Sequence, residues 1–143
     1  KAINQEDTLK MKFLTSHVER MLCQPLMDLH MREALQRKLG HIYYYLNEYT
    51  KAKDLLERTL HELRGQNSNG YEEIAETLMY LGDVYSVLSN YEQARKLSEE
   101  SLEIYQKHLS KNYLGTAKAL TYLGNVYRRL GNYEKAKELC QQS

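Results

Sequence analysis

Histidine and cysteine are the residue types in this 143-residue chain that could bind a metal or act as a nucleophile. The five histidines are His17, His30, His41, His61 and His108, and none pairs with a Cys, Asp or Glu at a metal-site spacing. Cys23 and Cys140 lie far apart, which argues against a disulfide framework and fits a reducing, cytoplasmic compartment. The sequence has no glycine-rich phosphate loop and no Gly-x-Ser-x-Gly motif. We therefore expect no enzymatic activity, no metal and no cofactor.

The charges of the chain are balanced, with 20 Lys and Arg against 19 Asp and Glu. A net charge of +1 gives no global field that would attract nucleic acid or an acidic membrane. Apolar runs are only a few residues long, too short for a transmembrane helix. These numbers predict a single domain and argue against nucleic acid or a membrane as its partner.

A repeated motif organises the chain, because Gly40, Gly82 and Gly124 lie 42 residues apart. The motif is Leu-Gly-x-x-Tyr, and its three copies are Leu39-Gly40-x-x-Tyr43, Leu81-Gly82-x-x-Tyr85 and Leu123-Gly124-x-x-Tyr127. Each copy is followed at the same distance by a Tyr-x-x-Ala segment, at Tyr49-x-x-Ala52, Tyr91-x-x-Ala94 and Tyr133-x-x-Ala136. A fixed period of this length predicts a stack of identical structural units.

Each unit is predicted to be an antiparallel pair of helices. Apolar side chains recur in steps of three and four along residues 74–88, which is the helical period, and again along 91–105. Tight turns are expected at Asn47-Glu48, Ser89-Asn90 and Gly131-Asn132. Polar segments at 64–70 and 108–112 join the hairpins and should cluster on one edge of the stack. The fold class is therefore an all-α solenoid.

The hairpins give repeats at 25–64, 71–109 and 113–143, the last of them truncated in its second helix. Residues 1–24 lack the Leu-Gly-x-x-Tyr motif, but 8–22 repeat the second-helix pattern. There Phe13, Leu14, Val18 and Met21 fall at the phases of Leu55, Leu56, Leu60 and Leu63. Gln24-Pro25 is expected to open the next helix. Both ends resemble cuts through an array, so end-to-end self-association is expected through 8–22 or 133–143.

The small residues of the repeat indicate close helix packing. Glycine costs about 1 kcal/mol in a helix interior, so three glycines at one phase imply a packing reason. Gly82 would let the second helix approach, with Ala94 as the matching small face. Tyr85 and its equivalents would fill the gap toward the next helix pair. Cys140 takes a core phase and is expected to be a buried structural thiol.

This pattern resembles the tetratricopeptide repeat, a helical hairpin with Leu-Gly-x-x-Tyr in its first helix and a small Ala early in its second. The 42-residue length is similar to the repeats of kinesin light chains and of many bacterial multidomain regulators. The resemblance covers 33–143 well and 1–32 poorly. It implies a right-handed superhelix whose concave face, lined by first helices, binds peptides.

The resemblance also implies which side chains line that concave face. They are Arg37, His41, Tyr44 and Tyr45 in the first repeat, Glu76, Met79, Tyr80, Asp83 and Ser86 in the second, and Lys118, Thr121, Tyr122, Asn125 and Arg128 in the third. Within Tyr43-Tyr44-Tyr45, the first tyrosine belongs to the core, and the other two point toward the groove or the turn.

Two functions remain open at this point. The first is a non-catalytic interaction scaffold that binds a peptide segment of a partner protein. The second is a regulatory sensor, in which effector binding changes the superhelix and gates an attached domain.

Repeats that hold acidic chaperone tails use cationic and carboxamide side chains where this chain has Arg37, His41, Tyr80, Lys118 and Tyr122. Because Asp83 adds a negative charge, we expect no binding of Glu-Glu-Val-Asp-type tails and a preference for mixed-charge partners. Their apolar anchors would lie against Tyr44, Met79 and Tyr122.

Overall fold

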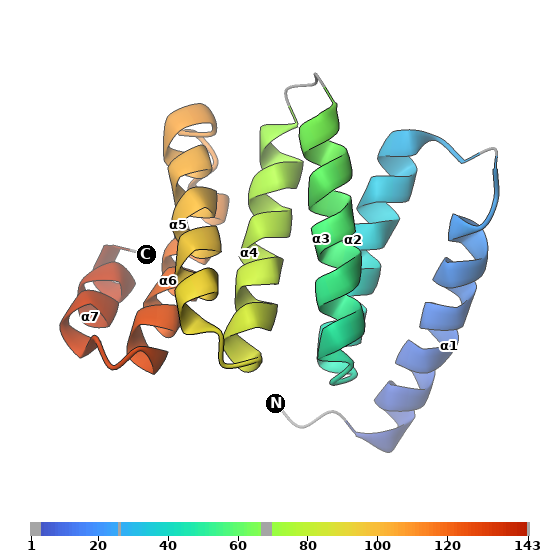
Figure 1. The fold of residues 1–143 in the computed structure, drawn as a ribbon, viewed down its shortest axis with the longest axis horizontal. Helices are drawn as coiled ribbons and strands as arrows, with labels where there is room; N and C mark the ends of the chain where they lie inside the picture. The colour runs from blue at the N-terminus through green and yellow to red at the C-terminus, as the bar shows by residue number, and fades with distance from the viewer. Residues whose placement is uncertain (1–3, 26, 67–69, 143) are drawn as a thin grey trace. The chain divides into compact units, whose positions relative to one another are not determined.

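The computed structural model describes residues 4–25, 27–66 and 70–142, and these form seven α-helices and no strand (Figure 1). The helices are α1 (Gln5–Leu22), α2 (Leu29–Tyr45), α3 (Tyr49–Gly65), α4 (Tyr71–Val87), α5 (Tyr91–His108), α6 (Tyr113–Arg129) and α7 (Tyr133–Gln142). The pairs α2–α3, α4–α5 and α6–α7 are the three predicted hairpins. The all-α repeat solenoid is thus confirmed, and the handedness of its superhelix stays a prediction.

The turn inside each hairpin has the same hydrogen-bonding pattern. The residue at the turn is left-handed in all three copies, with φ of 62° at Asn47, 64° at Ser89 and 81° at Gly131. The next N–H donates to the carbonyl of the Leu-Gly-x-x-Tyr tyrosine at 2.9 Å each time, from Glu48 to Tyr43, Asn90 to Tyr85 and Asn132 to Tyr127. This six-to-one bond around a left-handed residue is a Schellman motif, which satisfies carbonyls that the helix end leaves open. The predicted turn positions are confirmed.

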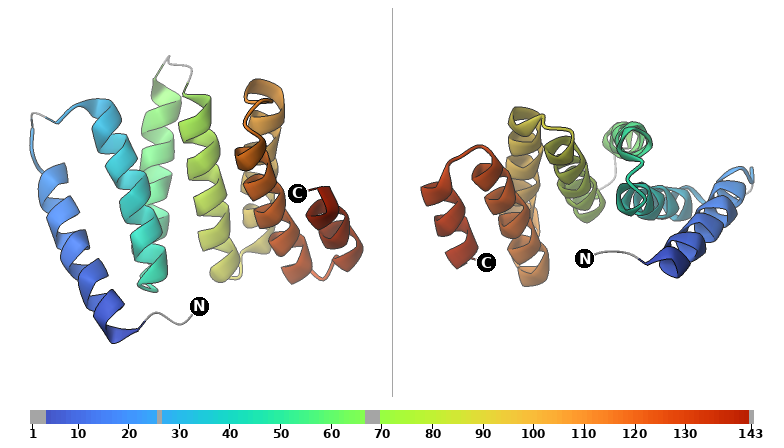
Figure 2. Two further views of the ribbon diagram at one scale, coloured as in Figure 1. Left: turned by 180° about the vertical axis from the view of Figure 1, so that it is seen from behind. Right: turned by 90° about the horizontal axis from the view of Figure 1, so that it is seen from below.

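The chain divides into two compact units, residues 1–59 and 60–143, and α3 runs through the boundary. In the second unit α4 and α5 form a hairpin, α6 packs against both, and α7 returns along α6 (Figure 2). A β-carbon placed on Gly82 would lie 2.7 Å from Ser98 Oγ and 3.3 Å from the Ala94 carbonyl oxygen. The close approach predicted for Gly82 and Ala94 is therefore confirmed.

A second close approach in this unit, absent from the sequence predictions, involves Gly115. A β-carbon on Gly115 would lie 2.3 Å from Cε1 of Tyr105, whose ring is 3% exposed. The ring of Tyr105 thus packs directly on the backbone of α6. Gly115 also has its N–H capped by Asn112 Oδ1 at 2.9 Å, which fixes the start of that helix.

In the first unit, α1 packs along α2, and α2 pairs with α3. Leu56 is fully buried and fills the space over Gly40, as predicted for this core phase. In α1 only one of the four matching phases is buried: Val18 is 7% exposed, whereas Phe13 and Leu14 are 74% and 48% exposed. Only Thr15 and Val18 of this helix are buried.

The predicted start of α2 at Gln24-Pro25 is also wrong. The helix begins at Leu29, with Asp28 at its N-cap position. The N–H of Cys23 donates to the Arg20 carbonyl at 3.3 Å and that of Gln24 donates to the Met21 carbonyl at 3.1 Å, and these two bonds end α1. Pro25 is exposed in the connection that follows. The chain therefore turns before it can enter the next helix.

Cys140 does not form the buried thiol expected from its phase. Its Sγ lies 3.2 Å from a β-carbon built on Gly124, as the repeat predicts, yet the residue is exposed. The reason is that no described helix packs on the other side of α7. Cys23 is exposed as well, as its position at a helix end indicates.

Candidate functional site

The first helices of the second and third repeats, α4 and α6, lie side by side and parallel. Near their starts, Asn112 Nδ2 donates to Glu72 Oε1 at 3.0 Å, and at their ends Arg129 Nη1 donates to the Ser86 carbonyl at 3.4 Å. Residues one period apart therefore lie at the same height on the two helices. Tyr80 and Tyr122 form such a pair and occupy the middle of this face.

The two tyrosines rest on an apolar core. Ala75, Met79, Tyr105 and Ala119 are buried together, and Tyr80 and Tyr122 pack against them. Met79 is 2% exposed and so cannot contact a peptide, and the same holds for Ser86. The prediction that these two side chains line the binding face is wrong. Helical phase alone does not separate the open face from the contact between α4 and α6.

The remaining predicted residues of α4 and α6 are accessible to different degrees. Lys118, Thr121 and Arg128 are exposed, whereas Glu76, Tyr80, Asp83, Tyr122 and Asn125 are half-buried. The two charge types lie on different helices, with Glu76 and Asp83 on α4 and Lys118 and Arg128 on α6. Neither Lys118 nor Arg128 forms an ion pair with a described residue. This surface, which we name the α4–α6 face, thus has an aromatic centre with acidic and basic sides.

The tyrosine hydroxyl on this face is held by a carboxylate. Tyr80 Oη donates to Glu76 Oε1 at 3.2 Å. Burial is the main cause that raises the pKa of Tyr80, and the charge of Glu76 and this hydrogen bond raise it further. The hydroxyl therefore stays protonated at neutral pH and acts as a hydrogen-bond donor, not as a base.

The predicted residues of the first repeat form a separate aromatic cluster at the end of α2. The ring centroids of His41 and Tyr45 are 4.7 Å apart with an interplanar angle of 65°, and those of Tyr44 and Tyr45 are 5.8 Å apart at 84°. Tyr44 also meets Tyr49, the first residue of α3, at 5.6 Å. Tyr45 is 46% exposed, and Tyr43 is buried as predicted. Arg37 is half-buried on the same helix.

The tyrosines of the Leu-Gly-x-x-Tyr motif are predicted to fill the gap toward the next helix pair, but the structure shows a different contact. Tyr127 Oη donates to Glu99 Oε1 on α5 at 2.5 Å, and Tyr43 Oη donates to Glu19 Oε1 on α1. Both side chains thus reach back to the preceding second helix, not forward to the next helix pair. Glu57 and Glu99 are 42 residues apart, so the period could have pointed to Glu99, but it could not have pointed to Glu19 because Thr15 stands at the matching position.

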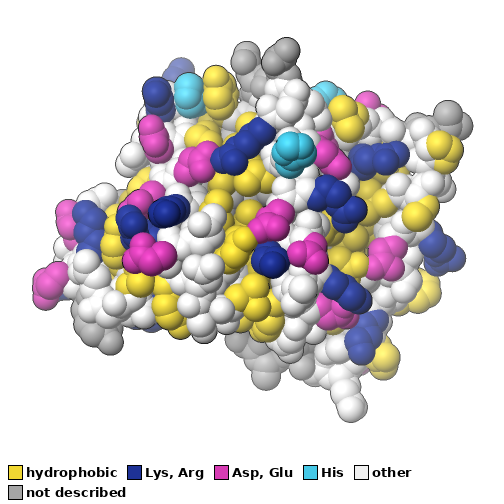
Figure 3. Space-filling model, viewed as in Figure 1, with side chains coloured by type: hydrophobic (Ala, Val, Ile, Leu, Met, Phe, Trp, Pro, Cys, Tyr) yellow, Lys and Arg dark blue, Asp and Glu magenta, His cyan; other side chains and the backbone are white. Residues whose placement is uncertain are grey.

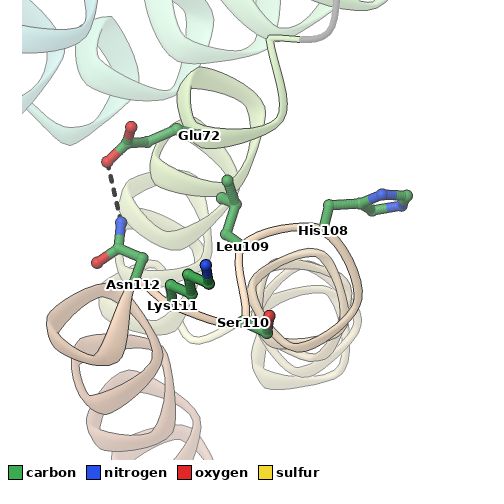
Figure 4. A pocket seen from close by; sticks show the side chains of 6 residues that line it. All are labelled: Glu72, His108, Leu109, Ser110, Lys111 and Asn112. Atoms are coloured by element: carbon green, nitrogen blue, oxygen red, sulfur yellow. Dashed lines mark hydrogen bonds between the residues drawn. The ribbon is translucent and has the colours of Figure 1, made fainter.

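A shallow depression of about 660 Å³ lies where α4 begins and α5 ends (Figure 4). Its lining residues are Glu72, His108, Leu109, Ser110, Lys111 and Asn112. The imidazole of His108 points away from the depression and stacks on Tyr71, with ring centroids 3.9 Å apart. Within the depression, Glu72 Oε1 accepts a hydrogen bond from Asn112 Nδ2. None of the predicted binding residues lies in it.

Within the described part of the chain, no three His, Cys, Asp or Glu side chains are grouped so that they could hold a metal ion. The helices described are also too short or too polar for any of them to cross a membrane. Acidic and basic side chains alternate over the face seen in Figure 3.

Comparison with known proteins gives a family match and several similar folds. Residues 73–143 match the family model described as tetratricopeptide repeat. No curated protein matches the chain. The solved structure of Bacillus thuringiensis PlcR in complex with the peptide PapR7 and DNA is similar with a TM-score of 0.73 and 17% identity, over 92% of this chain and 49% of that one.

Two further solved structures show the same arrangement of helices. BtubC (BKLC) from P. vanneervenii has a TM-score of 0.70 and 12% identity, over 99% of this chain and 56% of that one. A kinesin light chain from Podosopora anserina with nearly identical TPR-like repeats has a TM-score of 0.62 and 19% identity, over 96% and 64%. This chain therefore spans about half to two thirds of the structures it matches. At these identities the likeness is one of fold.

Proposed function

Because the chain belongs to the tetratricopeptide repeat family, we propose that it is a non-catalytic protein–protein interaction module that binds a peptide segment of a partner on its first helices. The observation that carries this proposal is the α4–α6 face. Tyr80 and Tyr122 give it an apolar centre supported by a packed core, so a bound side chain would lose water without rearranging the protein. Preformed sites of this kind bind at a lower entropic cost.

The charges beside the two tyrosines define the ligand. The cations Lys118 and Arg128 are exposed on α6, whereas α4 offers Glu76 and Asp83. A peptide with an aromatic or aliphatic anchor between an acidic and a basic residue matches both sides at once. Such a peptide would be oriented by the charges and held by the anchor.

Selection from a library of short random peptides tests this proposal. We expect the selected peptides to share an apolar anchor with flanking charges of both signs. Lys118→Glu should weaken their binding at least about tenfold, because it places a third acid on the face. The matched control is Lys137→Glu, which makes the same change on exposed α7. Equal affinity of both variants for the selected peptides, measured by fluorescence polarisation, would refute a site on α4 and α6.

The same face makes purely acidic tails poor ligands. Asp83 and Glu76 would repel them, and the carboxamides that orient a terminal carboxylate are absent at Tyr80 and Tyr122. A labelled Glu-Glu-Val-Asp peptide should therefore show no saturable binding. Low-micromolar affinity that depends on its free carboxylate would contradict this ligand class.

A regulatory sensor domain is the second candidate function. The observation that favours it is the likeness to PlcR, whose solved structure contains a peptide and DNA. A sensor must change conformation when it binds its effector, whereas a scaffold need not. Small-angle scattering with and without a selected peptide separates the two: a changed radius of gyration supports the sensor, and an unchanged one supports the scaffold.

A further inference from the structure

The outer side of α1 carries an exposed stripe that the proposed function does not use. Glu6, Leu9, Phe13, Ser16 and Arg20 follow each other in steps of three, four, three and four, which places them on one face of the helix. Thr15 and Val18 lie on the other side and are buried where α1 packs along α2 (Figure 1). Leu9 and Phe13, in the middle of the stripe, are 67% and 74% exposed.

Comparison with the other second helices shows that a first helix of the usual kind cannot pack closely against α1. In α3, α5 and α7 a small residue lets the first helix approach, and Ala52, Ala94 and Ala136 are 0%, 0% and 7% exposed. One period before Ala52 stands Lys10, whose ammonium pairs with Glu6 at 2.7 Å. A lysine at this point prevents the close approach that the alanines allow. The apolar stripe is therefore suited to a different packing partner.

We propose that the stripe is covered by α1 of a second copy of this chain, packed antiparallel across a twofold axis. An interface of this kind is self-complementary, so each residue contributes twice. Alternating spacing of three and four is that of helices that pack side by side, and in the antiparallel arrangement Leu9 of each copy meets Phe13 of the other. Four apolar side chains then form a small core at the axis.

The charges at the ends of the stripe complement each other in this arrangement. When Leu9 meets Phe13 of the second copy, Glu6 lies near Ser16 of that copy and within reach of the guanidinium of its Arg20. Helical side chains point toward the N-terminus, which directs Arg20 toward Glu6. The Glu6 side chain is 74% exposed, and Arg20 forms no ion pair with a described residue. Lys10 and Lys12 flank the axis in both copies, and their repulsion together with the small contact keeps the dimer weak.

Sedimentation velocity of the 143-residue chain over a wide concentration range tests the dimer. We expect a reversible monomer–dimer equilibrium that Phe13→Asp abolishes. The matched control is Leu114→Asp, which changes a side chain that is 68% exposed on α6 and should leave the equilibrium unchanged. Because both side chains are exposed, neither variant should unfold the protein, and circular dichroism verifies this.

Charge exchange tests the orientation of the two helices. Glu6→Arg and Arg20→Glu should each weaken the dimer about fivefold or more, because each places like charges together, and the variant with both changes should recover it. A chain that stays monomeric at the highest concentration overturns the proposal. So does a double variant that is folded but no tighter than the single ones, or a control that weakens the dimer as much as Phe13→Asp.

Discussion

The tyrosine of the Leu-Gly-x-x-Tyr motif contributes to the fold through both its side chain and its backbone. The hydroxyls of Tyr43 and Tyr127 donate to carboxylates of the preceding second helix, and their carbonyls accept the bond that closes the following turn. Glu99 also bonds Arg95, which is held in turn by Glu92. In both copies the tyrosine therefore ties the first helix of its hairpin to the helix that precedes it.

Tyr127→Phe should lower the free energy of unfolding by about 0.5–1.5 kcal/mol, because Glu99 loses a hydrogen bond while the ring is kept. Urea denaturation measures the change. The control is Tyr113→Phe, since Tyr113 is 79% exposed and should lose nothing measurable. An equal effect of the two substitutions would show that the hydrogen bond from Tyr127 to Glu99 does not contribute to the free energy of unfolding.

Glycines in this chain should respond to alanine in opposite ways. Gly115→Ala should destabilise the fold by about 1–3 kcal/mol, because its new methyl group would meet the buried ring of Tyr105. Gly65→Ala should be neutral or stabilise by up to about 1 kcal/mol, since a β-carbon there meets nothing within 4 Å. Thermal melting of both variants checks this, and a Gly115→Ala melting temperature at or above that of the parent would contradict the packing argument.

At the scale of elements, the three turns use three different residues for one left-handed conformation. Glycine adopts it without strain and asparagine tolerates it, but serine at Ser89 does not share either advantage. Ser89→Gly should therefore raise the free energy of unfolding by about 0.5–1 kcal/mol. Asn47→Gly should change it less. Equal or opposite shifts in urea midpoint for the two variants would argue against strain at Ser89.

The sequence alone was sufficient to predict the helices and turns of 33–142, because one period repeats there without interruption. Periodicity locates helical phase, but it does not say what covers each side. Met79 and Ser86, expected on the open face, are therefore buried, and Cys140, expected in the core, is exposed. Before Leu29 the motif is absent, so no other copy of the repeat indicates where a helix begins. The predicted start of α2 at Gln24-Pro25 is wrong for this reason.

At the scale of the whole molecule, stability should fall in alkaline solution. The pKa values of Tyr43, Tyr80 and Tyr127 are raised, in each case by burial first and then by a neighbouring glutamate. The folded state thus keeps protons that the unfolded state releases above about pH 10. The stabilisation is fully present below that pH and is lost as pH rises through the folded pKa values.

Urea midpoints measured between about pH 7 and pH 11 should be level at first and decline above about pH 10. A variant with Tyr43→Phe and Tyr127→Phe should decline less steeply, because two of the linked hydroxyls are gone. A midpoint that rises over this range would reverse the sign of the linkage and contradict the assignment.

The bonds from Tyr43 to Glu19 and from Tyr127 to Glu99 also determine how the protein emits light. The chain has 13 tyrosines and no tryptophan, so tyrosine alone supplies its near-ultraviolet fluorescence. An excited phenol passes its proton readily to a bonded carboxylate, which quenches the emission. We therefore expect these two rings to be dim while each hairpin packs on the preceding helix, and to brighten when the two separate. Tyrosine emission would then report on helix packing at two places, where α2 meets α1 and where α6 meets α5.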